Sequence, residues 1–436
     1  MKQLIFSKYW KKKIPLVGFL LIAAVLSTTN SFMQAHASSS ASAKAAPAGA
    51  FYTRQYRNLF AENGHSQKDI QSKLDAAWMQ LFYGDNNTQR VYYPVGTNMA
   101  YIEDIGNQDV RTEGMSYGMM IAVQLNKPQE FNRLWTWAKT YMYQTSGDYK
   151  GYFSWHNKTD GTVIDANPAS DGDQWFAMDL FLAAGRWGNG TGIYNYQAQA
   201  QSILHNMLHH GNVGVSTNMF DLQQKQVDFV PSGTAATYTD PSYHLPAFYR
   251  LWALWASEDN RFWADAATTS IKYFKKTTNA QTGLAPDYSN YDGTPVNQGG
   301  HGDFRFDAWR VASNVALDYS WFATDPWEVY QSNRLQNFFA SQGAYDSTNH
   351  MYHYGNQYSL TGTELSQDHS GGLAAMNSVA GLAAMDKQSK NFVDEVWNMP
   401  IPSGQWRYYD GMLYMLSLLE DSGNFRIYAP HSVHQR

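Results

Sequence analysis

Three acidic residues stand where a polar stretch of the chain becomes an apolar, helix-like stretch. Glu113 lies in Arg-Thr-Glu-Gly-Met, Asp171 in Ser-Asp-Gly-Asp, and Asp307 in Phe-Asp-Ala-Trp-Arg. Hydrolysis of a glycosidic bond requires a protonated carboxyl group for the leaving oxygen and a carboxylate that attacks carbon or activates water. Three acids at equivalent junctions provide these groups if the fold brings them together.

Glu113 faces one physical obstacle as a general acid. The positive end of a helix favours the ionised form of a carboxyl group by about 0.3–1 kcal/mol. Burial and the charges of Asp171 and Asp307 must therefore raise its pKa by more than the helix lowers it. The simpler interpretation is that Asp171 and Asp307 cap helices, each contributing about 1 kcal/mol, and that Asp307 pairs with Arg310 one turn later.

A second motif, at residues 114–118, matches the G-x-S-x-G pattern of a serine nucleophile. That pattern requires a buried strand before the serine, whereas residues 107–113 are polar. A serine hydrolase acting through Ser116 is therefore a disfavoured alternative.

Metal binding has only weak indications in the sequence. The spacing of four between His205 and His209, with His210 beside them, suits a metal site on a helix. No acid accompanies these histidines as in H-E-x-x-H, so a solvated helix face is the favoured interpretation. Four aspartates do not have the spacing of a calcium-binding loop: Asp160, Asp165, Asp171 and Asp173. No metal or other cofactor is expected.

The composition favours a neutral, hydroxyl-rich ligand. Aromatic residues make up 15% of the chain and charged residues only 16%. An aromatic ring covers the apolar face of a sugar while Tyr and Trp donate hydrogen bonds at its rim. Five lysines precede residue 38, and the remainder carries 27 basic against 37 acidic residues, a net charge of −10. Nucleic acid and anionic membrane are therefore poor partners.

The first 37 residues have the features of a secretory signal peptide. A basic region ends at Lys13, the apolar run 14–26 follows, and Ala-His-Ala at 35–37 suits cleavage. An uncleaved anchor is the alternative, but the run is short for a membrane span. Residues 38–50 are rich in Ser and Ala, and we expect them to form a flexible segment before the domain, here called the flexible lead. Export without any cysteine fits a secreted bacterial protein, free or attached at the cell surface.

Apolar periodicity and capping signals predict an all-α chain with almost no strand. The expected helices are 66–83, 114–124, 128–143, 171–186, 196–208, 243–256, 260–276, 304–322, 325–341, 371–385, 387–397 and 407–421.

The lengths of the connections alternate along the chain. Short loops follow every even-numbered helix from the second to the tenth, and mostly long, polar loops precede the even-numbered helices. Short loops make antiparallel helix hairpins, and long loops are usually functional. This alternation predicts six hairpins in an (α/α)6 barrel, a single catalytic domain at 51–428 with a tail at 429–436. In such a barrel, the acids at the starts of helices two, four and eight would lie at the same end as Tyr243 and the loop 366–372.

The acidic motifs resemble those of glycoside hydrolase family 8, over about residues 51–428. Its members are inverting (α/α)6-barrel enzymes that act on β-1,4-linked xylan, cellulose, chitosan or mixed-linkage glucan. The resemblance implies that Glu113 is the general acid and that Asp307 is the general base that activates water. Asp171 would hold the sugar at the cleavage subsite in a distorted form, and inversion would place the Glu113 and Asp307 carboxyls roughly 6.5–9.5 Å apart.

Further site residues follow from the same resemblance. Arg310 would orient Asp307, and Tyr243, Trp155 and Arg111 would lie in the sugar subsites. Within the family, several runs resemble the reducing-end xylose-releasing exo-oligoxylanases: 239–249, 283–287, 291–295, 407–410 and 422–425.

One segment departs from the exo-acting enzymes. Their kinked Leu-His-Pro segment walls off the cleft and senses the reducing-end hydroxyl, whereas this chain has Asp368-His369-Ser370. His369 would keep the sensing role, but the proline that stiffens the kink is missing.

The sequence therefore predicts a secreted, monomeric, inverting enzyme that hydrolyses β-1,4-xylo-oligosaccharides and releases xylose from the reducing end. An endo-β-1,4-glucanase or endo-xylanase with an open cleft is the alternative within the family. A carbohydrate-binding protein without catalysis is the alternative from another class, and an intact acid and base argue against it.

Overall fold

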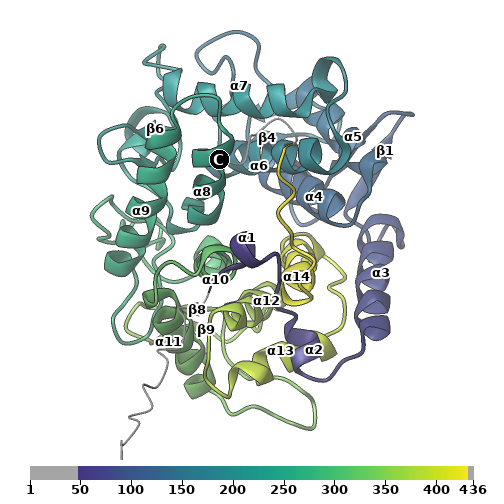
Figure 1. Cartoon of the computed structure of the whole chain (residues 1–436), viewed down its shortest axis with the longest axis vertical. Coiled ribbons are helices and arrows are strands. Elements are labelled where there is room, and N and C mark those ends of the chain that lie inside the picture. Colours follow the sequence, from purple (N-terminus) through teal and green to yellow (C-terminus); the bar gives the residue numbers. More distant parts are fainter. Residues whose placement is uncertain (1–47, 431–436) are drawn as a thin grey trace, which may run out of the picture. The chain divides into compact units, whose positions relative to one another are not determined.

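The computed structural model describes residues 48–430, and its long helices form an inner and an outer layer (Figure 1). The inner helices of this part of the chain are α4 (Thr112–Gln124), α6 (Ser170–Trp187), α8 (Pro246–Trp255), α10 (Val311–Phe322), α12 (Gly371–Val379) and α14 (Arg407–Asp421). The outer helices are α3 (Gln67–Tyr83), α5 (Pro128–Trp137), α7 (Tyr196–His209), α9 (Asn260–Thr277), α11 (Trp327–Gln342) and α13 (Ser389–Asn398).

The inner helices form a closed ring. In order, α8, α10, α12, α14, α4 and α6 each pack on the next. Side chains join α6 to α8: the rings of Trp175 and Phe248 lie 5.1 Å apart, and the Tyr249 hydroxyl donates to Gln174 at 2.6 Å. Each outer helix packs against one inner helix, with α3 on α14. The predicted (α/α)6 barrel is confirmed.

Burial explains why the two layers have different sequences. Every residue of α4 except Glu113 is buried, so this helix is apolar or small on all sides. The outer helix α9 buries one stripe that includes Trp263, Ala267 and Phe274, and its last turn carries Lys275 and Lys276. An amphipathic stripe is what a helix with one solvent face requires.

Several predicted helices are broken or shorter than the sequence pattern predicts, and two of them are altered at the end that faces the site. The predicted helix 243–256 begins only at Pro246, whose missing amide suits a first helical turn. The predicted helix 304–322 is a 3-10 turn, η5 (Phe306–Arg310), followed by α10. Helix 371–385 stops at Val379, and the predicted end of 128–143 is a π-helix. The remaining short helices are α1 (Ala50–Thr53), α2 (Leu59–Glu62), η1 (Ala138–Met142), η2 (Gly192–Tyr194), η3 (Gly233–Thr237), η4 (Pro241–Tyr243) and η6 (Ala380–Leu382).

The long loops contain short antiparallel strands that the periodicity did not predict. They pair as β1 with β2, β3 with β4 and β5, β6 with β7, and β8 with β9. The strands are β1 (Tyr92–Val95), β2 (Met99–Ile102), β3 (Val110–Arg111), β4 (His156–Asn157), β5 (Val163–Asp165), β6 (Phe220–Asp221), β7 (Gln226–Val227), β8 (Gln357–Tyr358) and β9 (Glu364–Ser366). Segments of two to four residues are too short for an alternating pattern to be recognised.

The start of the described chain packs against the end of α10. Ala50, assigned above to the flexible lead, begins α1 and is buried. A side chain at Gly49 would meet the Trp321 carbonyl oxygen at 2.2 Å, and the Phe51 ring lies 5.2 Å from that of Phe322. The predicted signal peptide, most of the lead and all but residues 429–430 of the tail lie outside the described residues. Within residues 48–430, no helix combines the length and apolarity needed to cross a membrane.

Candidate active site

A cleft of about 900 Å³ opens at the end of the barrel where the inner helices begin. The segments that precede all six inner helices contribute to its lining, and so do seven of the eight predicted site residues: Arg111, Glu113, Trp155, Asp171, Tyr243, Asp307 and His369. The eighth, Arg310, is 5% exposed and lies beneath the acids.

Arg310 joins the three predicted acids. Its Nη1 lies 3.2 Å from Oε2 of Glu113 and 3.0 Å from Oδ2 of Asp171, and its Nη2 lies 3.1 Å from Oδ1 of Asp307. The same guanidinium donates to the Ser242 and Tyr117 hydroxyls. The predicted contact with Asp307 is present, but Arg310 positions the whole acid cluster.

Glu113 lies in the first turn of α4, and Tyr408 of α14 reaches it from the neighbouring helix. The Tyr408 hydroxyl donates to Oε1 of Glu113 at 2.9 Å. Burial raises the pKa of Glu113 to about 7; the Arg310 charge opposes this rise, and the Asp307 and Asp171 charges add to it. Burial therefore outweighs the effect of the helix end on the pKa of Glu113, and a large fraction of Glu113 is protonated near neutral pH.

Asp171 is the most enclosed of the three acids. Its Oδ1 accepts the backbone N–H of Gly172 at 2.8 Å, and its side chain is 5% exposed. Burial raises its pKa, against the opposing charge of Arg310. A Cβ at Gly172 would lie 2.4 Å from the Thr112 side chain, so glycine permits the close approach of α6 to the start of α4.

Asp307 is more open to solvent than the other two acids. Its side chain is 29% exposed, and the Tyr409 hydroxyl donates to its Oδ1 at 3.4 Å. The preceding Phe306 has φ of 37°, a conformation that bulky residues rarely adopt and that occurs at functional sites. Glu113 and Asp307 contact different nitrogens of one guanidinium, but the predicted separation of their carboxyls stays a prediction.

Two further buried acids, Asp240 and Asp287, lie close to Asp307, and the sequence analysis assigned them no role. One oxygen each of Asp240, Asp287 and Asp307 lies within 4.8 Å of the others. Asp287 accepts the Ala308 amide at 3.0 Å and pairs with His301, which lines the cleft. Burial, with the charge of Asp307, raises the pKa of both Asp240 and Asp287 well above the usual range. The run 283–287 marked the position of Asp287 but not its contacts.

The predicted subsite residues surround the acids. Arg111 pairs with Asp104 and Asp109, and its guanidinium lies 5.5 Å from the centre of the Trp155 ring. Tyr243 is buried, and its ring centre lies 5.7 Å from the Arg310 guanidinium. All three residues line the cleft.

His369 lies at the cleft, but protein groups occupy both of its ring nitrogens. Nδ1 lies 2.9 Å from the Tyr354 carbonyl oxygen and Nε2 lies 3.0 Å from Oε1 of Glu395. Burial lowers the pKa of His369, but the bonds and charge from Glu395 and the Tyr354 carbonyl outweigh it, so the pKa is raised.

Exposed aromatic residues also line the cleft beyond the predicted set. Trp406 is 67% exposed, and Phe306 is 43% exposed. The only earlier signal for Trp406 was its place immediately before the 407–410 run. Ser116, by contrast, is buried within α4 and donates to the Glu113 carbonyl, so the serine hydrolase alternative is wrong.

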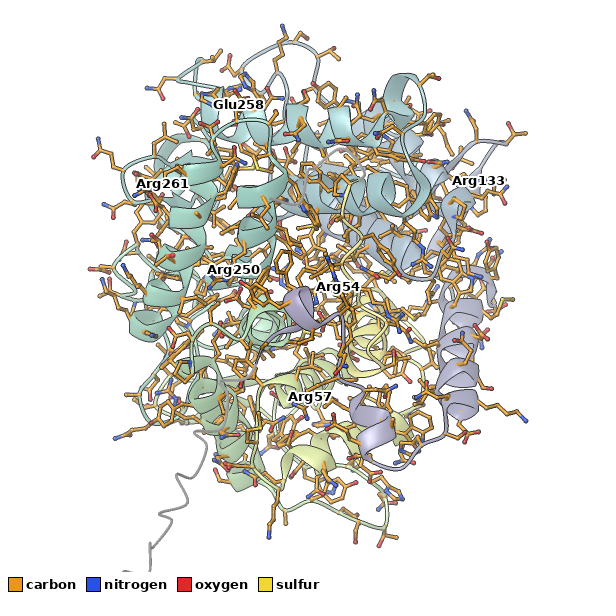
Figure 2. All side chains as sticks on the ribbon, in the orientation of Figure 1. Arg54, Arg57, Arg133, Arg250, Glu258 and Arg261 are labelled. Carbon is orange, nitrogen blue, oxygen red and sulfur yellow. The ribbon has the colours of Figure 1, made fainter. Side chains whose placement is uncertain are left out.

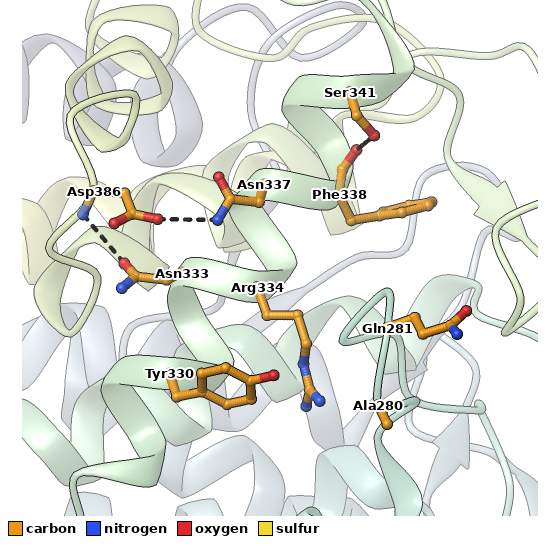
Figure 3. Close-up of a pocket in the computed structure, with 9 residues that line it drawn as sticks. All are labelled: Ala280, Gln281, Tyr330, Asn333, Arg334, Asn337, Phe338, Ser341 and Asp386. Atoms are coloured by element: carbon orange, nitrogen blue, oxygen red, sulfur yellow. Dashed lines mark hydrogen bonds between the residues drawn. The ribbon is translucent and has the colours of Figure 1, made fainter.

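A second hollow, of about 490 Å³, lies on the flank of the barrel beside α11 (Figure 3). Its one acid, Asp386, accepts from Asn337 at 2.9 Å, and Asn333 accepts from the Asp386 and Met385 amides. Without a second acid, this hollow has no acid and base for hydrolysis.

Comparison with known proteins agrees with this geometry. The model of the family "Glycosyl hydrolases family 8" matches residues 97–423. The chain belongs to glycosyl hydrolase family 8. This family 8 enzyme is therefore a glycoside hydrolase.

Individual relatives of the family 8 enzyme resemble it over most of their length. The reducing-end xylose-releasing exo-oligoxylanase of Paenibacillus barcinonensis is 47% identical over 87% of this chain and 98% of its own. That of Halalkalibacterium halodurans is 44% identical over 88% of this chain and 97% of its own. A family 8 xylanase of Teredinibacter turnerae, solved as a catalytic mutant with xylohexaose, has a TM-score of 0.84 and 44% identity, over 88% of this chain and 100% of that structure.

Proposed function

We propose that this enzyme is a secreted, inverting hydrolase of β-1,4-xylo-oligosaccharides that releases xylose from the reducing end. The observation that carries the proposal is the pair Glu113 and Asp307 on one guanidinium, with a pKa of about 7 for Glu113. The exo-oligoxylanase relatives support the choice of substrate and of product.

The residues divide the reaction between them. Glu113 gives its proton to the oxygen of the leaving sugar as the glycosidic bond breaks. Asp307, the more exposed acid, takes a proton from a water molecule that attacks the anomeric carbon from the opposite face. Inversion follows because this single displacement forms no covalent intermediate.

Arg310 has a second task in this mechanism. After the proton leaves Glu113, the guanidinium at 3.2 Å stabilises the new carboxylate. Its ion pair with Asp307 at 3.1 Å orients the base. Asp171 is fixed by Arg310 and by the Gly172 amide, which positions it for a hydroxyl of the sugar at the cleavage subsite.

The His369 segment favours endo-xylanase action as a second candidate. Both ring nitrogens of His369 are bound by the protein, and Asp368 is exposed where the exo-acting relatives are expected to have a wall. A cleft open on this side would admit a chain that continues past the cleavage point.

One time course distinguishes the candidates. Xylotriose, reduced xylotriose and xylohexaose are each incubated with the enzyme, and the anomers are followed by NMR in the first minutes. Reducing-end release predicts xylose from xylotriose, no cleavage of the reduced form, and an initial α-anomer. Internal cleavage of xylohexaose would establish the endo alternative. An initial β-anomer would contradict inversion, and Glu113→Gln should abolish turnover while retaining binding.

A further inference from the structure

The helix face that carries His205 and His209 lies against the turn between α8 and α9. Glu258 belongs to this turn and is exposed; it is labelled in the upper part of Figure 2. The sequence placed no acid near the histidines, but the fold supplies two. Oε1 of Glu258 lies 2.7 Å from Nδ1 of His205, and Oδ2 of Asp259 lies 2.6 Å from Nε2 of His209.

The backbone on both sides of this cluster is fixed by other contacts. Gln201, one helical turn before His205, donates to the Trp255 carbonyl at 2.7 Å and accepts the Ser257 amide at 2.9 Å. Asp259 precedes α9, and its carbonyl accepts the Trp263 amide at 3.1 Å. The turn is therefore tied to α7, while the side chains of His205, His209 and Glu258 remain 52%, 43% and 51% exposed.

We propose that His205, His209 and Glu258 form a binding site for a divalent transition metal ion such as Zn²⁺. One ligand atom of each residue lies within 4.8 Å of the others. Small side-chain rotations bring such a set onto one ion, because Zn–N and Zn–O distances are about 2.0–2.2 Å. Asp259 accepts from the His209 ring and orients it, as carboxylates do for metal-bound histidines.

The donor set selects the kind of ion. Two imidazoles and one carboxylate suit Zn²⁺, Ni²⁺ or Cu²⁺. Ca²⁺ and Mg²⁺ prefer oxygen ligands only, so they should not compete.

The site has a structural consequence that is separate from catalysis. α7 packs on α6, and the turn joins α8 to α9, so a bound ion would link two neighbouring hairpins of the barrel. An ion that binds only the folded chain raises its stability. The cleft residues do not include His205, His209 or Glu258, so hydrolysis should proceed at an unchanged rate.

Calorimetric titration of Zn²⁺ into the full chain, without a histidine tag, tests the proposal. We expect one ion per chain with a micromolar or tighter Kd, and a higher Tm in Zn²⁺ than in EDTA. His205→Gln, His209→Gln and Glu258→Gln should each weaken binding by at least ~10-fold and remove the Tm difference. His353→Gln, which removes another exposed histidine, is the matched control and should change neither result.

The melting curves in EDTA separate ligand loss from misfolding. Because the three side chains are exposed, each variant should melt in EDTA at the wild-type temperature. Zn²⁺ binding that is equal in the wild type and His205→Gln/His209→Gln would overturn the proposal. Displacement of Zn²⁺ by equimolar Ca²⁺, or no measurable Zn²⁺ binding to the wild type, would overturn it as well.

Discussion

Arg310 is the single cation in contact with the three carboxylates of the site, among the residues that the structure describes. Glu113, Asp171 and Asp307 touch it directly, and Asp240 and Asp287 stand behind. One guanidinium cannot balance five buried or half-buried negative charges, so part of the cluster holds protons. The raised pKa of Glu113 is one result of this imbalance, and it is the property that a general acid near neutral pH requires.

Tyr408 provides a direct test of the protonation state of Glu113. Its hydroxyl stabilises the ionised carboxylate and so lowers the pKa of Glu113, although burial has the larger, opposite effect. Tyr408→Phe removes the lowering contribution, so the pKa should rise. Since the acid must be protonated, activity falls as pH rises through this pKa, and the variant should lose activity at a higher pH than the wild type. The measurement is kcat against pH on a xylo-oligosaccharide.

Tyr414→Phe is the matched control for this measurement. Tyr414 lies on the same helix, is buried, and has no hydroxyl contact with Glu113. Its profile should coincide with that of the wild type. If the basic limb of the kcat–pH profile moved to lower pH in Tyr408→Phe, Tyr408 would not stabilise the Glu113 carboxylate.

At the scale of single residues, the sequence revealed the groups that carry charge at helix starts. Tyr408 occupies the same kind of junction as Glu113, but an uncharged residue in an aromatic-rich chain attracts no attention. The pairing of Asp287 with His301 arises between two points of one long loop. Such a contact depends on the path of the loop and has no periodic signal.

At the scale of elements, the starts of the inner helices are packed more closely than ordinary side chains allow. A Cβ at Gly114 would lie 2.5 Å from Cε2 of Tyr408 and 2.8 Å from its hydroxyl oxygen. Gly114→Ala should therefore push Tyr408 away from Glu113, although alanine is the better helix former. We expect a loss of roughly 1–3 kcal/mol of stability together with a lower kcat, measured by thermal melts and steady-state kinetics.

Gly371→Ala separates this packing effect from the general effect of a glycine change. Gly371 begins α12, and a Cβ there would meet its nearest neighbour, Met399, at an ordinary 3.4 Å. This variant should be neutral or slightly more stable, by up to about 1 kcal/mol. A neutral Gly114→Ala would mean that Tyr408 can move without cost and that its position is not set by α4.

The long helices were predictable because burial imposes a pattern on them, whereas their breaks near the site were not. Amphipathic outer helices and uniformly apolar inner helices are visible in the sequence. The turn η5 before α10, with Phe306 at positive φ, has no signal in residue types. It depends on surrounding contacts such as the Ala308 amide bound to Asp287. Where the chain forms the site, contacts with surrounding residues therefore determine the backbone conformation, and the local helix preference of the sequence does not.

At the scale of the whole molecule, the alternation of short and long loops determined the position of the site. Five short loops lie at one end of the barrel and six long ones at the other, and each long loop or the helix start after it supplies residues to the cleft. The count and order of helices therefore predicted where the acids meet. The extent of the cleft, which decides how much of a chain is bound, depends on loop surfaces that the sequence pattern did not reveal.

Trp406 is an exposed loop residue of the cleft, and we expect it to extend substrate binding along the cleft. Its indole packs on the 104–109 turn, where a Cβ at Gly106 would lie 2.8 Å from Cζ3, and it is 67% exposed. An exposed indole face binds the apolar face of a sugar, and a stacking contact of this kind is worth about 0.5–1.5 kcal/mol. On the proposed substrates, Trp406→Ala should raise KM for xylohexaose by up to roughly tenfold, because 1.4 kcal/mol corresponds to a factor of ten.

A shorter substrate and a distant aromatic residue complete this test. The KM of Trp406→Ala for xylotriose should change little if Trp406 contacts a sugar beyond the first three. Tyr330→Ala, in the flank hollow (Figure 3), should change the KM for neither xylotriose nor xylohexaose. Equal increases for both substrates would place Trp406 beside the cleaved bond. Such a result would also remove the argument that the cleft extends past it, and with it one reason to expect cleavage within long chains.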